Sequence, residues 1–309
     1  MHRGPGGLRK GRAMAQIHHF DHGWITPTIS YILSVLGSLL GLTLAVRFRS
    51  ARSQGERVWW LILAAVAIGG TAIWSMHFVA MMGFSVTGTP IRYDVGLTVA
   101  SAIIAVIAVG IGLVIALFGA KAQNFRIIAG GIIAGLGVAA MHYTGMAAMH
   151  LNGEISYSVT RVGMSIGIAV VAASVALWLA VTVRKPLIIF VSALVMGIAV
   201  NGMHFTGMSA MSVTEHPPTG ELAGAAATSL IVPIGASVVF GIIGLAYALM
   251  AAPTEEDREA AAYLAARREA AAANTDTFPR QAAASQAEGS QRGASALGGA
   301  SWTYRDRAR

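Results

Sequence analysis

Three copies of one short motif carry the side chains of this sequence that are best suited to bind a metal ion. Each copy begins with methionine, histidine and an aromatic residue, and closes with a second methionine three residues further on. The copies are Met76-His77-Phe78-Val79-Ala80-Met81, Met141-His142-Tyr143-Thr144-Gly145-Met146 and Met203-His204-Phe205-Thr206-Gly207-Met208. Their histidines are separated by 65 and 62 residues, so the pattern indicates an internal repeat rather than chance.

Helical geometry predicts which of these side chains lie together. At about 100° per residue, the positions four and seven after a histidine lie within roughly 40° of it on a helix. His142 therefore shares a stripe with Met146 and Met149, whereas Phe84 takes the third place in the stripe that begins at His77. The predicted ligands are His77, Met81, His142, Met146, His204, Met208, Met149 and Met211.

Other motif residues are weaker candidates. The leading methionines lie about 100° from the stripe, where they can pack against neighbouring helices, and His150 continues the face of His142 only in part. The weaker metal ligands are thus Met76, Met141, Met203 and His150, and the aromatic and hydroxyl positions of the motifs are Phe78, Tyr143, Thr144, Phe205 and Thr206.

The donor atoms favour copper. A thioether is a soft ligand and imidazole a borderline one, a combination that suits Cu(I), whereas hard cations prefer the carboxylates that these motifs lack. The sequence has no cysteine, which excludes thiolate sites, iron–sulfur clusters and c-type haem attachment. Two alternatives stay open: a b-type haem with histidine or methionine axial ligands, and a structural role in which Asn201, Ser75 or backbone carbonyls hold the histidines.

The elements that position the motifs are seven apolar segments, each long enough to cross a bilayer as a helix. The mean hydropathy is +0.63 and only 12% of residues are charged, against about 25% in soluble domains. This composition excludes a soluble globule, a coiled coil and a disordered chain. The fold predicted is an all-α polytopic membrane protein with a lead helix and three repeated helical hairpins, spanning residues 25–46, 58–82, 94–118, 127–149, 162–182, 187–211 and 228–250.

The distribution of lysine and arginine predicts how the chain is oriented in the membrane. They gather in the loops after the first, third and fifth spans and in the tail, so these parts are expected to be cytoplasmic and the N-terminus outside. The histidines, His18, His19 and His22 among them, then fall in the outer half, where copper arrives. Because topology explains the net charge of +8, no nucleic-acid partner is predicted.

Three regions follow from this pattern. Residues 1–24 form an extracytoplasmic N-terminal segment, 25–250 the membrane domain and 251–309 a cytoplasmic tail. The basic residues before Met14 conflict with an outside N-terminus, which favours translation from Met14. In the tail, acidic residues after Pro253 and Thr254 predict a short Ala-rich helix, and the residues beyond Asn274 are expected to be disordered.

The motifs resemble the MHYT family of bacterial integral membrane proteins, and the resemblance extends over residues 20–250. Met141, His142, Tyr143 and Thr144 match the family motif completely; the third copy has Phe205 for tyrosine, and the first has Phe78 and Val79 for tyrosine and threonine. The resemblance implies a sensor in the bacterial cytoplasmic membrane that binds copper near the outer face and detects oxygen, carbon monoxide or nitric oxide. Many such proteins carry cytoplasmic output domains.

The motifs and the membrane topology fit two functions. The leading prediction is a membrane sensor that binds copper and signals to an unknown cytoplasmic partner, because the tail is too short for a kinase or a nucleotide cyclase. The alternative is a copper permease or insertion factor. Motifs of hydrolases and nucleotide-binding enzymes are missing and no paired carboxylates occur in the spans, so no enzymatic activity is predicted.

Overall fold

A computed structural model of the chain describes residues 15–18, 20–119, 121–215, 221–250, 260 and 262–271. The chain divides into two compact units, residues 1–250 and 251–309. In the second unit, residues 260 and 262–271 are helical, as the Ala-rich composition predicts. The proposed start at Met14, the helix-start signal at 253–257 and the tail beyond Asn274 lie outside the described residues.

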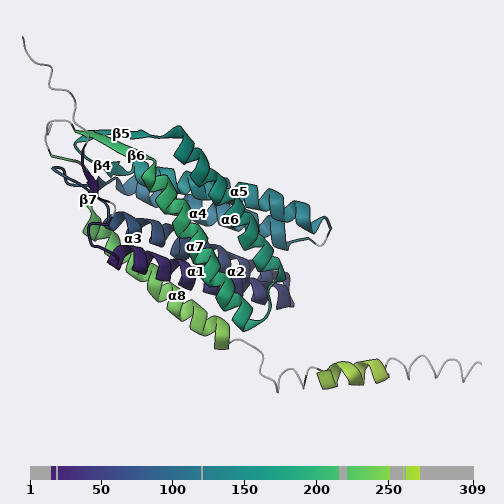
Figure 1. Cartoon of the computed structure of the whole chain (residues 1–309). Coiled ribbons are helices and arrows are strands. Elements are labelled where there is room, and N and C mark those ends of the chain that lie inside the picture. Colours follow the sequence, from purple (N-terminus) through teal and green to yellow (C-terminus); the bar gives the residue numbers. More distant parts are fainter. Residues whose placement is uncertain are drawn as a thin grey trace, which may run out of the picture. The chain divides into compact units, whose positions relative to one another are not determined.

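All seven predicted spans are helical, and their ends differ from the expected ones by a few residues (Figure 1). Asp94 begins the third span by accepting a hydrogen bond from the Leu97 backbone nitrogen at 2.7 Å, and Pro186 occupies the first turn of the sixth. The bounds are α1 Ile25–Ser50, α2 to α3 Gln54–Met82, α4 Val95–Leu117, α5 Gln123–Ala147, α6 Val159–Thr182, α7 Pro186–Ser209, and η2 with α8 Ala227–Met250.

The second span is less regular than the sequence predicts. It comprises the α-helix α2 (Gln54–Ala65), the π-helix η1 (Val66–Ser75) and the α-helix α3 (Met76–Met82). Gly69 in η1 lies against the backbone of α4, where a Cβ atom would approach Ala105 O to 2.9 Å. The π-helix ends directly before the first motif, so the motif itself keeps α-helical geometry.

Within the part of the chain that the structure describes, seven short strands lie at one end of the bundle, and none of them was predicted from the sequence. They form three small antiparallel sheets, β1–β2, β4–β3–β7 and β5–β6, and the end that carries them is termed the strand end below. The strands are β1 Ile17–His18, β2 Ser85–Val86, β3 Arg92–Tyr93, β4 Met149–His150, β5 Gly153–Tyr157, β6 Met211–Glu215 and β7 Ala225–Ala226.

Backbone hydrogen bonds at the strand end repeat three times. The Asp94 nitrogen, at the start of α4, donates to the Ala148 carbonyl at the end of α5, at 2.8 Å. The Ser158 nitrogen, before α6, likewise donates to Ala210 O after α7 at 2.9 Å, and the Asp21 nitrogen, before α1, to Gly83 O after α3 at 2.9 Å. The spans therefore also pair as α1 with α2–α3, α4 with α5 and α6 with α7, and α8 packs beside α1 and η1.

Two glycine pairs with the four-residue spacing typical of packed membrane helices lie at helix contacts, whereas a Cβ atom on either glycine of a third pair, Gly163 and Gly167, would meet nothing within 4 Å. Gly37 and Gly41 of α1 face η1, and a Cβ atom on either would overlap Ala72 or Ile68. Gly131 and Gly135 of α5 face α6, where a Cβ on Gly135 would lie 2.5 Å from Val170 Cα. Small residues thus let these helix backbones approach closely, as small-xxx-small spacing predicts.

Arginines tie the helices together at the opposite end. Arg49 donates to the Val181 and Val183 carbonyls at the end of α6, and Arg47 donates to the Ala248 carbonyl at the end of α8. Both arginines lie within α1, which runs four residues beyond its predicted end at residue 46. The physical reason for the longer helix is that the two arginine side chains donate to carbonyls at the ends of α6 and α8. These carbonyls have no hydrogen-bond partner within their own helices.

Candidate metal centre

The three motif histidines meet in the interior of the bundle. His77, His142 and His204 are each 1% exposed, and within the described residues they form the one group of three or more His, Asp or Glu side chains that could hold a metal ion. Each lies five residues before the end of its helix, at Met82, Ala147 and Ser209 respectively. The prediction that three helices of one direction bring the imidazoles to one depth is confirmed.

The rings meet through their Nδ1 atoms. His77 Nδ1 lies 3.0 Å from His204 Nδ1 and 3.1 Å from His142 Nδ1. The ring centroids are 4.9 to 5.2 Å apart, and the ring planes are close to perpendicular. We refer to these three side chains as the histidine trio.

The opposite ring edges are closed off by glycines of the next motif copy. His77 Nε2 lies where a Cβ atom on Gly145 would stand, and His142 Nε2 lies where a Cβ on Gly207 would stand. Both Nε2 atoms are buried without a hydrogen-bond partner. Because those edges are covered, Nδ1 is the atom through which these two rings can bind a ligand. Both glycines are part of the motifs, but the sequence pattern alone does not assign them this role.

The convergence of three Nδ1 atoms fits a bound cation. Nitrogen atoms at these separations repel one another if each carries a lone pair and clash if each carries a hydrogen. Without a metal, the two contacts can be hydrogen bonds only if some of the rings carry their hydrogen on Nδ1 and others carry it on Nε2. A metal ion accepts all three lone pairs at once. With metal–nitrogen bonds of about 2.0 Å, three ligands of one ion lie roughly 3.3 to 3.5 Å apart, a few tenths of an ångström more than the two separations here.

The methionines predicted as ligands divide into two groups. Met81, Met146 and Met208 lie on the motif helices, four residues after each histidine, and are at most 2% exposed. Met149 and Met211 are also buried, but the helical stripe predicted for them is wrong. Helices α5 and α7 end before them, and these two residues begin β4 and β6. The weaker candidates Met76, Met141 and Met203 are 2 to 3% exposed.

Side chains at the third and fourth motif positions bond or pack to residues outside the trio. The Tyr143 hydroxyl lies 2.6 Å from Ser165 Oγ, and Thr206 Oγ1 donates to its own helix at Gly202 O at 2.7 Å. Rings following the motif histidines contact other aromatic rings, with Phe78 against Tyr93, Tyr143 against Tyr157 and Phe205 against Phe20.

Two tyrosines outside the spans stay neutral in this aromatic layer. Burial raises the pKa of Tyr93, and burial with the neighbouring Tyr143 raises the pKa of Tyr157. His150, a weaker ligand candidate, lies on β4 and not with the trio. Its Nδ1 lies 3.0 Å from the Ala223 carbonyl oxygen.

Among the described residues, neither Asn201 nor Ser75 forms a hydrogen bond with His77 or His142. The Asn201 amide instead accepts from Ser30 Oγ at 2.9 Å and donates to Ser34 Oγ at 3.1 Å, which joins α7 to α1. Ser75 Oγ is buried without a hydrogen-bond partner. Asn201 therefore forms hydrogen bonds between helices, but these bonds do not involve the trio.

Replacing Asn201 by alanine should lower stability without affecting metal binding. Interhelical hydrogen bonds in membranes contribute on average about 0.6 kcal/mol and at most about 1.7 kcal/mol, and this variant removes two of them, so we expect a loss of roughly 1 to 2 kcal/mol. Unfolding of the purified protein in mixed detergent micelles measures the loss, and metal analysis of the same sample measures binding. A variant that loses its metal while remaining folded would link Asn201 to the trio.

Comparison with known proteins places the chain among bacterial signalling proteins. A model of the MHYT family, described as "Bacterial signalling protein N terminal repeat", matches residues 70–131 and 135–193. The bifunctional diguanylate cyclase/cyclic di-GMP phosphodiesterase MucR of Pseudomonas aeruginosa is 41% identical over 211 residues, which are 67% of this chain and 30% of that protein. No solved structure matches.

Further relatives show the same partial coverage. An uncharacterized signaling protein of Caulobacter vibrioides is 31% identical over 70% of this chain and 27% of its own length. The signaling protein YkoW of Bacillus subtilis is 30% identical over 62% of this chain and 24% of its own length. The chain thus spans less than a third of the curated relatives that it matches, and the residues that the family model matches lie in its membrane part.

Proposed function

The chain belongs, through its membrane domain, to the MHYT family of bacterial signalling proteins, and from that premise we propose that it is a sensor whose histidine trio binds copper. The observation that carries the proposal is that His77 Nδ1 approaches His204 Nδ1 to 3.0 Å and His142 Nδ1 to 3.1 Å, with one histidine from each motif copy. The signalling role is common to relatives named as signalling proteins.

The trio would hold the ion through Nδ1 of His77, His142 and His204, with thioethers on the same helices as supplementary ligands. Copper bound there would supply a redox-active centre open to a small diatomic ligand. The protein's own contribution is to bury the three rings and to fix the orientation of His77 and His142 against Gly145 and Gly207. Because each histidine comes from a different helix, binding would change how the three helices pack together.

We propose that the strand end faces outward, since the arginine-rich loops lie at the other end, and that a cytoplasmic partner receives the signal. The positive-inside rule supports this orientation. Relatives named as cyclic di-GMP enzymes make an enzyme of cyclic di-GMP metabolism a suitable partner to test first.

Neither alternative is favoured by a particular observation. Two rings in direct Nδ1 contact leave no space between them for a porphyrin, which argues against haem. For a copper permease, the side chains one turn further from the strand end are Ile73, Val138 and Val200, which offer no ligand to pass the ion on.

Metal analysis together with an absorption spectrum tests the proposal. Protein purified in mild detergent and supplied with both copper and haem should contain near-stoichiometric copper and show no Soret band. A Soret band would assign the site to haem instead. Folded protein with neither cofactor would mean that the trio is structural, and the copper proposal would be wrong.

A further inference from the structure

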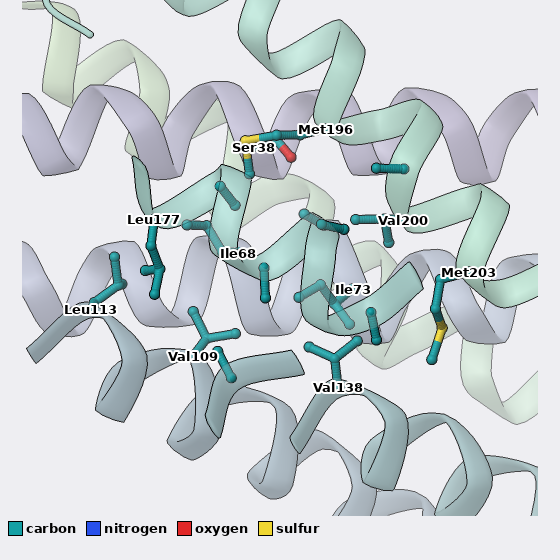
Figure 2. A pocket seen from close by; sticks show the side chains of 17 residues that line it. Ser38, Ile68, Ile73, Val109, Leu113, Val138, Leu177, Met196, Val200 and Met203 are labelled. Atoms are coloured by element: carbon teal, nitrogen blue, oxygen red, sulfur yellow. The ribbon is translucent and has the colours of Figure 1, made fainter. Parts of the chain in front are cut away.

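An apolar cavity lies in the centre of the bundle, on the side of the trio away from the strand end. It has a volume of about 60 Å³, and Figure 2 shows side chains such as Val109, Val138 and Ile73 pointing into it from different helices. Its lining comes from α1, η1, α4, α5, α6 and α7, so it lies where the three repeats meet.

The cavity lies about one helical turn from the trio. Ile73, Val138 and Val200 line it, and each stands four residues before a trio histidine. Four residues are close to one helical turn, so these side chains lie on the histidine faces about 6 Å further along the helices. Met203, next to His204, also lines the cavity. A molecule in the cavity would thus lie within about one turn of the imidazoles.

The lining selects small apolar molecules. Ser38 is the one residue with a polar side chain among 17 lining residues. A buried water molecule needs two to four polar partners, so this cavity excludes water although it exceeds the space that one water requires. Dry cavities lined by aliphatic side chains bind xenon and similar apolar molecules.

A groove between α6 and α7 lies beside the cavity and opens to the lipid-facing surface. Ala172, Met196 and Ala199 line both the groove and the cavity. Further along the groove, Val171 is 64% exposed and Val195 is 51% exposed, as expected for side chains that face hydrocarbon. Apolar gases dissolve in hydrocarbon more readily than in water, which makes the bilayer core their natural source.

We infer that the central cavity binds small apolar molecules of the size of a diatomic gas, and that they reach it from the bilayer core through the groove between α6 and α7. The cavity would deliver such a molecule to the trio from the membrane side rather than from the aqueous side. This delivery role rests on the proposed function, whereas binding in the cavity does not depend on a metal.

Xenon is the probe that tests the cavity without involving copper. The full chain in detergent, free of metal, should bind xenon saturably in ¹²⁹Xe NMR. Ala199→Phe should reduce this binding at least tenfold, because it fills the wall shared by cavity and groove. The matched control is Ile198→Phe, one residue away on α7 and 63% exposed outside both linings, which should bind xenon as the parent does.

A second variant and a second measurement keep the inference falsifiable if Ala199→Phe does not fold. The smaller change Ala172→Leu narrows the same wall and should reduce xenon binding several-fold. In copper-loaded protein, either variant should slow the association of carbon monoxide at least tenfold without changing copper content.

The outcomes separate the two proposals. If the parent protein does not bind xenon, or if the variants bind it as the parent does, the proposal that the cavity binds small apolar molecules is wrong. If the protein binds xenon but no copper, the proposal for the cavity stands and the proposal of a copper-binding sensor is wrong. Carbon monoxide association at the parent rate in a variant that has lost xenon binding would overturn the route from the bilayer.

Discussion

Replacing His77, His142 and His204 together by alanine should abolish copper binding while the seven helices remain folded. The three rings supply all three converging Nδ1 atoms, and no other His, Asp or Glu among the described residues joins this group. Thioethers alone would bind copper too weakly to survive purification. Metal analysis after gel filtration measures the loss, and circular dichroism of the same fractions checks the fold.

The matched control changes three histidines that lie outside the trio. A variant with His18, His22 and His150 replaced by alanine removes as many imidazoles, yet His150 bonds to the Ala223 carbonyl and none of the three joins the trio. We expect it to keep its copper. Equal loss in both variants would locate the copper elsewhere on the strand end, and unchanged copper in the trio variant would refute the assignment.

Single replacements should also lower copper content, since each histidine is one of three ligands on a separate helix. His77 has a central position because its Nδ1 approaches both of the others, at 3.0 and 3.1 Å. Its motif copy is the one that departs furthest from the family pattern, with Phe78 and Val79 in place of tyrosine and threonine. The geometry indicates that these departures do not displace the ligand, because side chains at the aromatic and hydroxyl positions bond or pack to residues outside the trio.

The spans and the depth of the histidines could be predicted from the sequence because both depend on local pattern. An apolar run of bilayer length specifies a helix, and a motif at one end of alternate helices specifies a shared layer. The errors concern Met149 and Met211, where the sequence pattern continues the helical stripe. The Met149 backbone instead pairs with Tyr93, and Met211 with Tyr157, so contacts with distant strands decide where the helices end.

Ring orientation and the central cavity could not be predicted, because both arise between helices. Which nitrogen of His142 faces the centre depends on Gly207, which is 65 residues away on another helix. The cavity needs small side chains from several helices at one level, such as Ala134, Ala173 and Ala176. Each alanine taken alone is an ordinary residue of a membrane helix.

Replacing Gly207 by valine should weaken copper binding about 10- to 100-fold, although glycine is not a ligand. The His142 ring occupies the space that a Cβ atom at this position would need, so a branched side chain must push the ring away from the centre. Changes to groups that orient metal-bound histidines commonly cost this much affinity. Competition with a Cu(I) chelator measures the affinity.

Gly202→Val on the same helix is the control for helix propensity and for added bulk. A Cβ atom at Gly202 meets nothing within 4 Å, and the residue is exposed. Both variants put valine for glycine in α7, so they share the change in helix propensity and differ in contact with His142. Equal affinities in the two variants would show that the glycine beside the ring does not orient it, and Nδ1 would then have no preference over Nε2 as the ligand atom.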